Sequence, residues 1–214
     1  GVMNLIFEYC PKGTLDEAIA KKRVPAGEDA LVRFLYQLLD ALKFLKGLRI
    51  LHRDVKPANM LLANEATMKL ADFGVATYVV EPLKSHDGTP AFFPPEVHQL
   101  PRGKGYSFPM DAWASGVSMY MLLFEGVHPF SDRGCISKEM LRNAEFEVGW
   151  LTSTKAKDLL AWLLMPSPDQ RITPEEALRH PWFASYGLGA GDFTKERPSK
   201  LVLDSHGNWL KTSN

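Results

Sequence analysis

The sequence lacks several features that would assign a protein to a class at once. Only two cysteines, Cys10 and Cys135, occur among the 214 residues, far apart, so the sequence offers neither a disulfide framework nor a metal-binding CxxC pair. Neither sign of charge dominates, because 25 Lys and Arg residues balance 25 Asp and Glu residues. We therefore expect no general attraction to nucleic acid or to an anionic membrane, and a reducing, cytoplasmic location.

Long apolar runs are also missing. The segment GVMNLIFEYCPKG is too short in apolar residues to span a bilayer and lacks the basic start of a signal peptide. We interpret Val2 to Tyr9 as a β-strand that needs partner strands. Because the chain begins within this strand and without an initiator Met, we expect a preceding lobe in a longer polypeptide.

The composition, 45% hydrophobic and 23% charged, fits one domain with a substantial core. Apolar residues at helical spacing predict an amphipathic helix over 28–49, and two apolar runs around ANEAT predict a small hairpin directly after it. The segment 111–126 is apolar nearly all round, which predicts a buried helix. The expected fold is mainly α with a small β-hairpin.

The C-terminal third continues this helical pattern. Residues 153–165 predict a further amphipathic helix. Thr173 and Glu176 have the spacing of a capping box with Pro174 between them, and Pro181 is expected to end that helix. From residue 184 to residue 214 the sequence is rich in Gly, Ser and charge, and we interpret it as a tail.

Polar residues gather in HRDVKPAN, between the first helix and the hairpin. Asp54 in this segment and Asp72 in the later ADFG are acids in apolar surroundings, so each needs a cation, a metal ion or hydrogen-bond donors. Asn59 and Asp72 offer the oxygen ligands that Mg²⁺ prefers and would also hold a polyphosphate. Asp54 is then free to accept a proton from a hydroxyl, and Lys56 to neutralise charge on a transferred group.

Each motif is weak alone, because an isolated DFG is common by chance and a lone HRD is more often a helix end with a surface ion pair. In this order, however, HRDVKPAN, ADFG and PPE resemble the signature set of eukaryotic protein kinases. Two departures are Val55 in place of Leu and Pro94 in place of Ala. The resemblance implies a hinge and C-terminal kinase lobe over 1–183, with 184–214 as a tail and no N-terminal lobe in this chain.

The resemblance also implies roles for the polar residues. Asp54 is similar to the catalytic base, and Lys56 to the lysine that steadies the γ-phosphate and marks the serine/threonine branch. Asn59 and Asp72 match the Mg²⁺ ligands of the family. Thr89, in GTPAFFPPE, is expected to contact Asp54 and Lys56.

Structural partners follow from the same resemblance. Glu96 is expected to pair with Arg171, the alternative being two unrelated surface charges. Asp111 resembles the residue that anchors the catalytic loop from the buried helix. His52 and Phe73 resemble members of the hydrophobic spine that stacks in active kinases.

The segment NLIFEYCPKGTLDEAI resembles the hinge that binds the adenine of ATP. Glu8, through its carbonyl, and Cys10, through its amide and carbonyl, are expected to face the purine. Thr14 or Asp16 is expected to reach the ribose, and Leu61 to pack beneath the adenine. Cys10 is interpreted as a spacer rather than a reactive thiol, because no basic neighbour would lower its pKa.

Regulation leaves a weaker trace in the activation segment. Ser85 lies where many kinases carry an activating phosphate, which would pair with Arg53 and imply an upstream kinase as a partner. Glu81 and Asp87 already supply negative charge, so a loop that is ordered without phosphate remains equally compatible. The GTPAF string is similar to calmodulin-dependent kinase kinases, and Ala58 stands where arginine-directed kinases often have an acid.

Two functional hypotheses remain. The first is a serine/threonine kinase that transfers the ATP γ-phosphate to a hydroxyl of a protein substrate, present here as a partial catalytic domain. The second is an inactive scaffold or decoy, because these 214 residues contain no Gly-rich loop or strand Lys with its helix Glu. Without an upper lobe, Leu61 and Phe7 are expected to form an exposed apolar patch.

Overall fold

The computed structural model describes residues 4–23, 27–100, 102–132, 134–144, 146, 152–195, 202–203 and 209–210. Its helices are α1 (Leu15–Ala20), α2 (Glu28–Gly47), α3 (Pro95–His98), α4 (Pro109–Leu123), α5 (Lys138–Asn143), α6 (Thr154–Leu163), α7 (Pro174–Leu178) and α8 (Pro181–Ala184), with 3₁₀ turns η1 (Pro57–Asn59) and η2 (Pro90–Phe92). Its strands are β1 (Ile50–Leu51), β2 (Met60–Leu62), β3 (Met68–Leu70), β4 (Thr77–Tyr78), β5 (Ser131–Asp132), β6 (Cys135–Ile136), β7 (Val202–Leu203) and β8 (Trp209–Leu210).

Helices dominate this architecture, as the sequence predicts. The strands form antiparallel pairs, β1 with β4, β2 with β3, β5 with β6 and β7 with β8. The predicted hairpin is the β2–β3 pair, in which Leu61 lies opposite Lys69. The expected mainly helical fold with a small hairpin is therefore confirmed.

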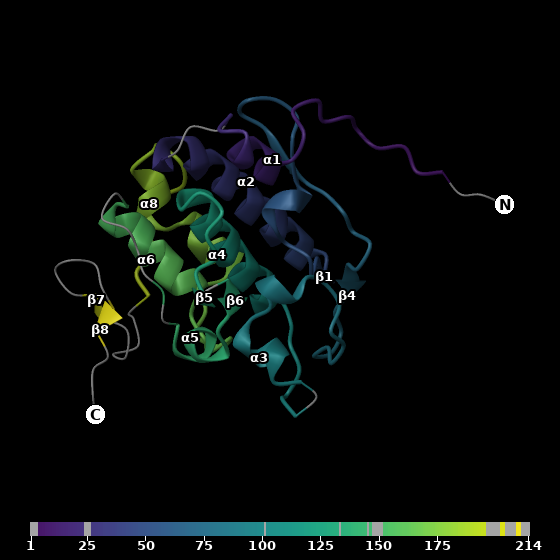
Figure 1. Cartoon of the computed structure of the whole chain (residues 1–214), viewed down its shortest axis with the longest axis vertical. Coiled ribbons are helices and arrows are strands. Elements are labelled where there is room, and N and C mark those ends of the chain that lie inside the picture. Colours follow the sequence, from purple (N-terminus) through teal and green to yellow (C-terminus); the bar gives the residue numbers. More distant parts are fainter. Residues whose placement is uncertain are drawn as a thin grey trace.

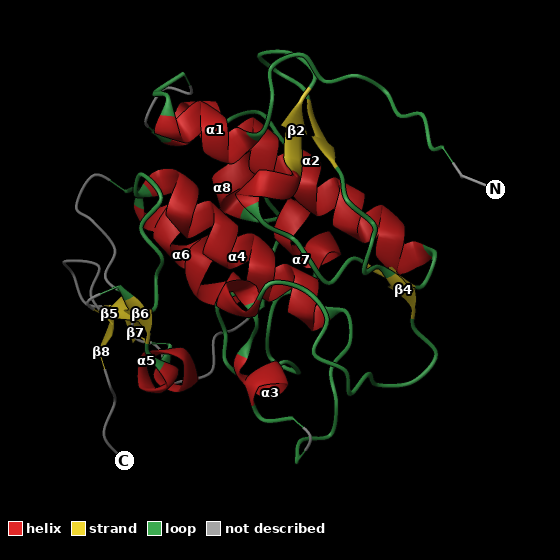
Figure 2. Cartoon of the chain, turned by 45° about the vertical axis from the view of Figure 1, so that its right-hand side comes forward, coloured by secondary structure: helices red, strands yellow, loops and turns green. Residues whose placement is uncertain are grey.

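The core is built around α4. This helix packs against α2 and α6, and α2 also packs against α7 (Figures 1 and 2). Residues all round α4 are buried, Trp113 and Val117 among them. A helix buried on every side needs apolar residues on every side, which is the pattern seen in the sequence. The helix from which the predicted anchor Asp111 projects is thus fixed within the molecule.

The C-terminal helices differ in one respect from the expectation. The capping box is present, since the Thr173 hydroxyl accepts from the Glu176 backbone and the Glu176 carboxylate accepts from the Thr173 backbone. However, α7 already ends at Leu178, and Pro181 begins α8 instead of ending α7. Proline lacks a backbone N–H and has a fixed φ, both of which suit the first position of a helix.

The packing continues past residue 183, where the tail was expected to begin. The boundary at 183 cuts through α8, and Arg179 forms a two-pronged ion pair with Asp192 at 2.8 Å for each contact. The Phe193 ring lies 5.5 Å from that of Trp162 and 5.6 Å from that of His180. Residues 184–195 therefore cover the core.

The N-terminal segment differs more. Residues 4–9 contain no strand, so the predicted strand over Val2–Tyr9 is wrong for these residues, and residues 1–3 lie outside the described residues. A strand needs a partner for its backbone groups, and no described strand pairs with this segment. The segment extends away from the body of the protein (Figure 1), and Phe7 is 79% exposed, as predicted, while Leu61 is half-buried. No helix in the described part is long and apolar enough to cross a membrane.

Close packing of α4 against α6 generates a first prediction. A Cβ atom at Gly116 would lie 2.8 Å from Leu163 Cβ and 3.0 Å from Leu164 Cδ2. We expect Gly116→Ala to lower the free energy of unfolding, measured in urea, by about 1–3 kcal/mol. Gly47→Ala is the control, because a Cβ there meets nothing within 4 Å, and it should leave stability unchanged or raise it by up to about 1 kcal/mol. Equal effects of the two substitutions would contradict this view of the interface.

Candidate active site

The polar segment 52–59 is held to α4 by Asp111. The Asp111 carboxylate accepts hydrogen bonds from the backbone N–H of His52 at 2.8 Å and of Arg53 at 3.0 Å. Burial raises the pKa of Asp111 to about 6, against the opposing effect of these two backbone N–H groups and of Arg53. The predicted anchoring contact is present, and it fixes the backbone of the two residues that precede Asp54.

Asp54 lies at the centre of a hydrogen-bonded cluster. Its Oδ1 accepts from Thr89 Oγ1 at 2.6 Å, and its Oδ2 lies 2.8 Å from Lys56 Nζ. Lys56 Nζ also donates to Thr89 Oγ1 at 2.7 Å, and Asn59 Nδ2 donates to Asp54 Oδ2 at 2.9 Å. Burial raises the pKa of Asp54, but the hydrogen bonds from Lys56, Thr89 and Asn59 outweigh it, so the net pKa is lowered. The structure thus brings three predicted residues together around the ionised carboxylate of a fourth, Asp54.

Asn59 and Asp72 also lie close in the fold. The backbone carbonyl of Asn59 accepts a hydrogen bond from the backbone N–H of Ala71 at 2.9 Å, which places the backbone of Asp72 directly beside η1. Asp72 has a left-handed φ of 62° and an exposed side chain, whose Oδ1 accepts from Gly74 N at 3.1 Å. The Asn59 amide nitrogen is committed to Asp54, so its oxygen and the Asp72 carboxylate are the atoms suited to a cation. These oxygen ligands fit Mg²⁺.

His52 and Phe73 are in contact, as the resemblance to kinases implied. Their rings lie edge to face with centroids 4.9 Å apart. His52 is fully buried, its Nε2 lies 3.0 Å from the Ala71 carbonyl, and burial lowers its pKa. Phe73 is 49% exposed, so only half of this pair is covered in the described structure.

The activation segment is held by Arg53. This guanidinium donates to the Val75 carbonyl and to the Asp87 carboxylate, and at 3.1 Å to the Ser85 hydroxyl. Asp87 therefore already provides Arg53 with an anionic partner, the role expected of a phosphate on Ser85. Phosphorylation of Ser85 stays a prediction.

The end of the activation segment is fixed by Glu96. Arg171 Nη1 and Nη2 donate to its two carboxylate oxygens at 2.7 and 3.0 Å. The Arg171 side chain is fully buried, and it also donates to the carbonyls of Met165, Pro109 and Pro166. The predicted pair is confirmed, and the alternative of two unrelated surface charges is wrong.

The predicted adenine-binding residues lie beside β2. Residues 12–14 run along this strand, with Lys12 N donating to the Leu62 carbonyl at 3.2 Å and Leu62 N to the Gly13 carbonyl at 2.8 Å. Cys10 and Leu61 are both half-buried, whereas Glu8 is exposed with its carboxylate 3.4 Å from Lys69 Nζ. The structure places Leu61 in β2 opposite Thr14, with Cys10 just before the residues that contact this strand, and leaves Glu8 on the extended segment.

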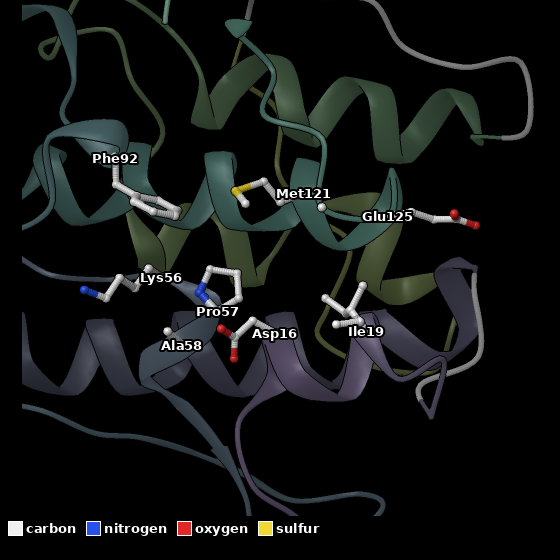
Figure 3. Close-up of a pocket in the computed structure, with 10 residues that line it drawn as sticks. Asp16, Ile19, Lys56, Pro57, Ala58, Phe92, Met121 and Glu125 are labelled. Carbon is white, nitrogen blue, oxygen red and sulfur yellow. The ribbon is translucent and has the colours of Figure 1, made fainter. Parts of the chain in front are cut away.

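A pocket of about 300 Å³ beside the cluster was not predicted from the sequence. Figure 3 shows Ile19, Pro57, Phe92 and Met121 lining it, with Asp16 at its edge. Its lining comes from α1, η1, η2 and the end of α4, which lie far apart in the chain, so no sequence spacing could have indicated it. The Lys56 side chain lines the pocket and also reaches Thr89, so the pocket adjoins the catalytic cluster.

Comparisons with known proteins agree with this geometry. The family model described as the protein kinase domain matches residues 1–183. The chain is 38% identical to the mouse serine/threonine-protein kinase DCLK3 over 205 residues, 90% of this chain and 25% of the relative. It is 35% identical to the Arabidopsis thaliana CBL-interacting serine/threonine-protein kinase 16 over 193 residues, 83% of this chain and 40% of the relative.

A third relative is the human phosphorylase b kinase gamma catalytic chain, liver/testis isoform, 34% identical over 191 residues, 85% of this chain and 47% of the relative. The chain therefore belongs to the protein kinase domain family. It spans between a quarter and a half of the length of these three relatives. None of the three is a calmodulin-dependent kinase kinase, and that finer assignment stays a prediction.

The buried Glu96–Arg171 pair generates a stability prediction. Glu96→Gln would leave the Arg171 charge buried without its anion, and we expect the free energy of unfolding to fall by about 3–5 kcal/mol. Asp192→Asn is the matched control, since it breaks a two-pronged arginine pair whose side chains are 57% and 54% exposed, and it should cost less than about 1 kcal/mol. Urea unfolding of both variants measures the difference. Similar losses would show that burial does not govern these pairs.

The raised pKa of Asp111 generates a prediction on the pH dependence of stability. Because the folded-state pKa of Asp111 is raised to about 6, the folded state binds a proton between pH 4 and 6 more readily than the unfolded state. Protonation of Asp111 therefore contributes about 3 kcal/mol to the free energy of unfolding below pH 4, and this contribution is lost as the pH rises toward 6. Asp111→Asn removes this titration. The difference in unfolding free energy between wild type and variant should therefore change over pH 4–6 and be flat above it, and a constant difference would contradict the prediction.

Proposed function

We propose that the protein is a serine/threonine kinase, transferring the γ-phosphoryl group of ATP to a Ser or Thr hydroxyl of a protein substrate. The observation that carries the proposal is the ionised Asp54 carboxylate, bound by Lys56, Thr89 and Asn59 beside an open pocket. The serine/threonine kinase names of two of the relatives support the acceptor class.

Asp54 is the residue suited to orient the acceptor. Its Oδ1 already accepts a bond from a threonine hydroxyl, Thr89, at 2.6 Å, which is the interaction that a substrate hydroxyl needs. During transfer, the acceptor oxygen forms a bond to the γ-phosphorus while the bond from that phosphorus to the β–γ bridging oxygen breaks, and the hydroxyl proton passes to Asp54. Since the pKa of Asp54 is lowered, its main contribution is orientation, with proton transfer late in the reaction.

Lys56 and the cation ligands supply positive charge to the same place. Lys56 Nζ lies within 2.8 Å of both Asp54 and Thr89, so its charge stands beside the acceptor oxygen as negative charge is redistributed. Mg²⁺ held by Asn59 and Asp72 would neutralise the phosphate oxygens. Thr89 limits the freedom of both the Asp54 carboxylate and the Lys56 amine.

The remaining contacts are finer proposals on the same basis. The backbone of Glu8 and Cys10, with Leu61, is assigned to the adenine, and Asp16 to the ribose. The protein substrate is assigned to the pocket of Figure 3, because that pocket adjoins Lys56. An upstream kinase acting on Ser85 and a cytoplasmic location complete the proposal, the latter in keeping with two free cysteines.

Asp54→Asn tests the chemistry. The amide keeps the shape but loses the negative charge and the proton acceptor, so transfer of radiolabelled phosphate to a mixed set of Ser/Thr peptides should fall about 10²–10⁴-fold. Asp40→Asn is the control, because Asp40 is exposed on α2 and its nearest cation, Lys43, is 3.9 Å away. Its activity should equal that of the wild type.

Two other outcomes count against the proposal. Transfer that survives Asp54→Asn would remove Asp54 from the reaction. A folded wild-type chain that binds peptides but transfers no phosphate would favour the scaffold function.

A further inference from the structure

A second, basic pocket lies between α3 and α5, which pack against each other (Figures 1 and 2). Its volume is about 180 Å³, and it is lined by Pro95, His98, Gln99, Lys138, Leu141 and Arg142. A water molecule occupies about 30 Å³ in the liquid, so the pocket has room for a group of several heavy atoms. No carboxylate of the described residues contributes to its lining.

The two strongest cations of this pocket come from one face of α5. Lys138 and Arg142 are four residues apart, which places their side chains side by side on the helix. Arg142 Nε donates to the Lys138 carbonyl at 3.2 Å, which orients the guanidinium and leaves its terminal N–H groups for other partners. Among the described residues, no carboxylate forms an ion pair with either side chain.

The nearby acids do not cancel this charge. Glu139 lies three residues before Arg142 on α5, a spacing that allows contact, but in the described part of the chain it forms no ion pair with Arg142 or Lys138. Glu96 is bound through both its oxygens by the buried Arg171. An adjoining hollow of about 570 Å³ shares His98 and Gln99 with the pocket and adds Arg102 to the cations. Burial lowers the pKa of His98, the charges of Lys138 and His86 lower it further, and Glu96 and the Phe93 backbone oppose this in part.

The chain connects this pocket to the catalytic cluster over a short distance. Thr89 contacts Asp54, and Pro95, which lines the basic pocket, follows six residues later. Six residues span at most about 20 Å. An extended peptide with its hydroxyl at Asp54 therefore reaches the basic pocket within about six residues. Phe92, between the two, lines the pocket of Figure 3.

We propose that the pocket between α3 and α5 binds an anionic side chain of the protein substrate, either a phosphorylated residue or a carboxylate, within about six residues of the acceptor hydroxyl. This inference rests on the proposed kinase function. The planar donors of Arg142 match the oxygens of phosphate and carboxylate, and Lys138 adds a point charge beside them. Substrates that carry such an anion are preferred over neutral ones.

The test uses the full chain and a set of peptides with one serine acceptor. A phosphoserine, a glutamate or an alanine is placed at each of six positions on either side of the acceptor. The ratio of kcat/KM for the anionic peptide to that for the alanine peptide should be roughly tenfold or more at the favoured position. Fluorescence anisotropy of labelled phosphoserine, glutamate and alanine peptides measures binding without requiring phosphate transfer.

The double variant Lys138→Gln, Arg142→Gln should reduce this ratio to about one in both measurements. Arg33→Gln with Lys22→Gln is the matched control, since Arg33 on α2 and Lys22 after α1 are exposed cations outside both pockets. The control should keep the full ratio. Arg142→Lys preserves the charge, and an intermediate ratio in this variant is the result expected for recognition by the planar guanidinium.

The outcomes separate this inference from the proposed function. Phosphorylation of the alanine peptide with no gain from any anion overturns the inference and leaves the kinase function intact. Equal loss in the control variant also overturns it, because the effect would then be one of general charge. If no peptide is phosphorylated, the kinase function fails for this chain, and the anisotropy measurement tests the pocket by itself. Anion-dependent binding that is lost in the double variant supports the site. A lack of anion-dependent binding overturns it. A gain from phosphoserine alone identifies the phosphate, and an equal gain from glutamate identifies the carboxylate.

Discussion

The candidate site depends on the contact between the Asp111 carboxylate and the backbone N–H groups of His52 and Arg53. Asp111 belongs to α4, which is buried between α2 and α6 and cannot shift without moving the core. A loop of strongly polar residues would otherwise have many conformations available to it. The contact holds the backbone of His52 and Arg53 against α4, and it thereby limits the movement of Asp54, which follows Arg53 directly.

A second buried charge does the same for the activation segment. Arg171 binds Glu96 through both terminal nitrogens and three backbone carbonyls through the rest of its donors. Burial of this ion pair is costly, and these hydrogen bonds offset the cost. The position of α3 is thereby fixed relative to α4. The two ends of the segment are therefore fixed relative to Asp54: Thr89 lies at one end and the basic pocket at the other.

The sequence predicted those features that depend on neighbours along the chain. The helix α2, the hairpin β2–β3 and the Thr173 capping box follow from local spacing, and the grouping of Asp54, Lys56 and Asn59 follows from one short segment. The strand predicted for residues 2–9 is wrong for residues 4–9, because a strand depends on partners elsewhere. Neither pocket was predicted, because Met121 and Ile19, or His98 and Lys138, meet only through the packing of separate helices.

The two pockets differ in charge, because acids as well as Lys56 line the pocket of Figure 3, whereas the charged residues described in the other pocket are cations. Asp16 and Glu125 are acids on the pocket of Figure 3, so the absence of an acid at Ala58 does not make that pocket neutral. Lys138 and Arg142 line the other pocket. An extended substrate bound across both would be favoured in one chain direction, because the reversed direction places its anion beside Asp16 and any cation beside Lys138. Under the proposed function, the different charges of the two pockets would favour one chain direction by repulsion of the reversed one, without an additional attractive contact.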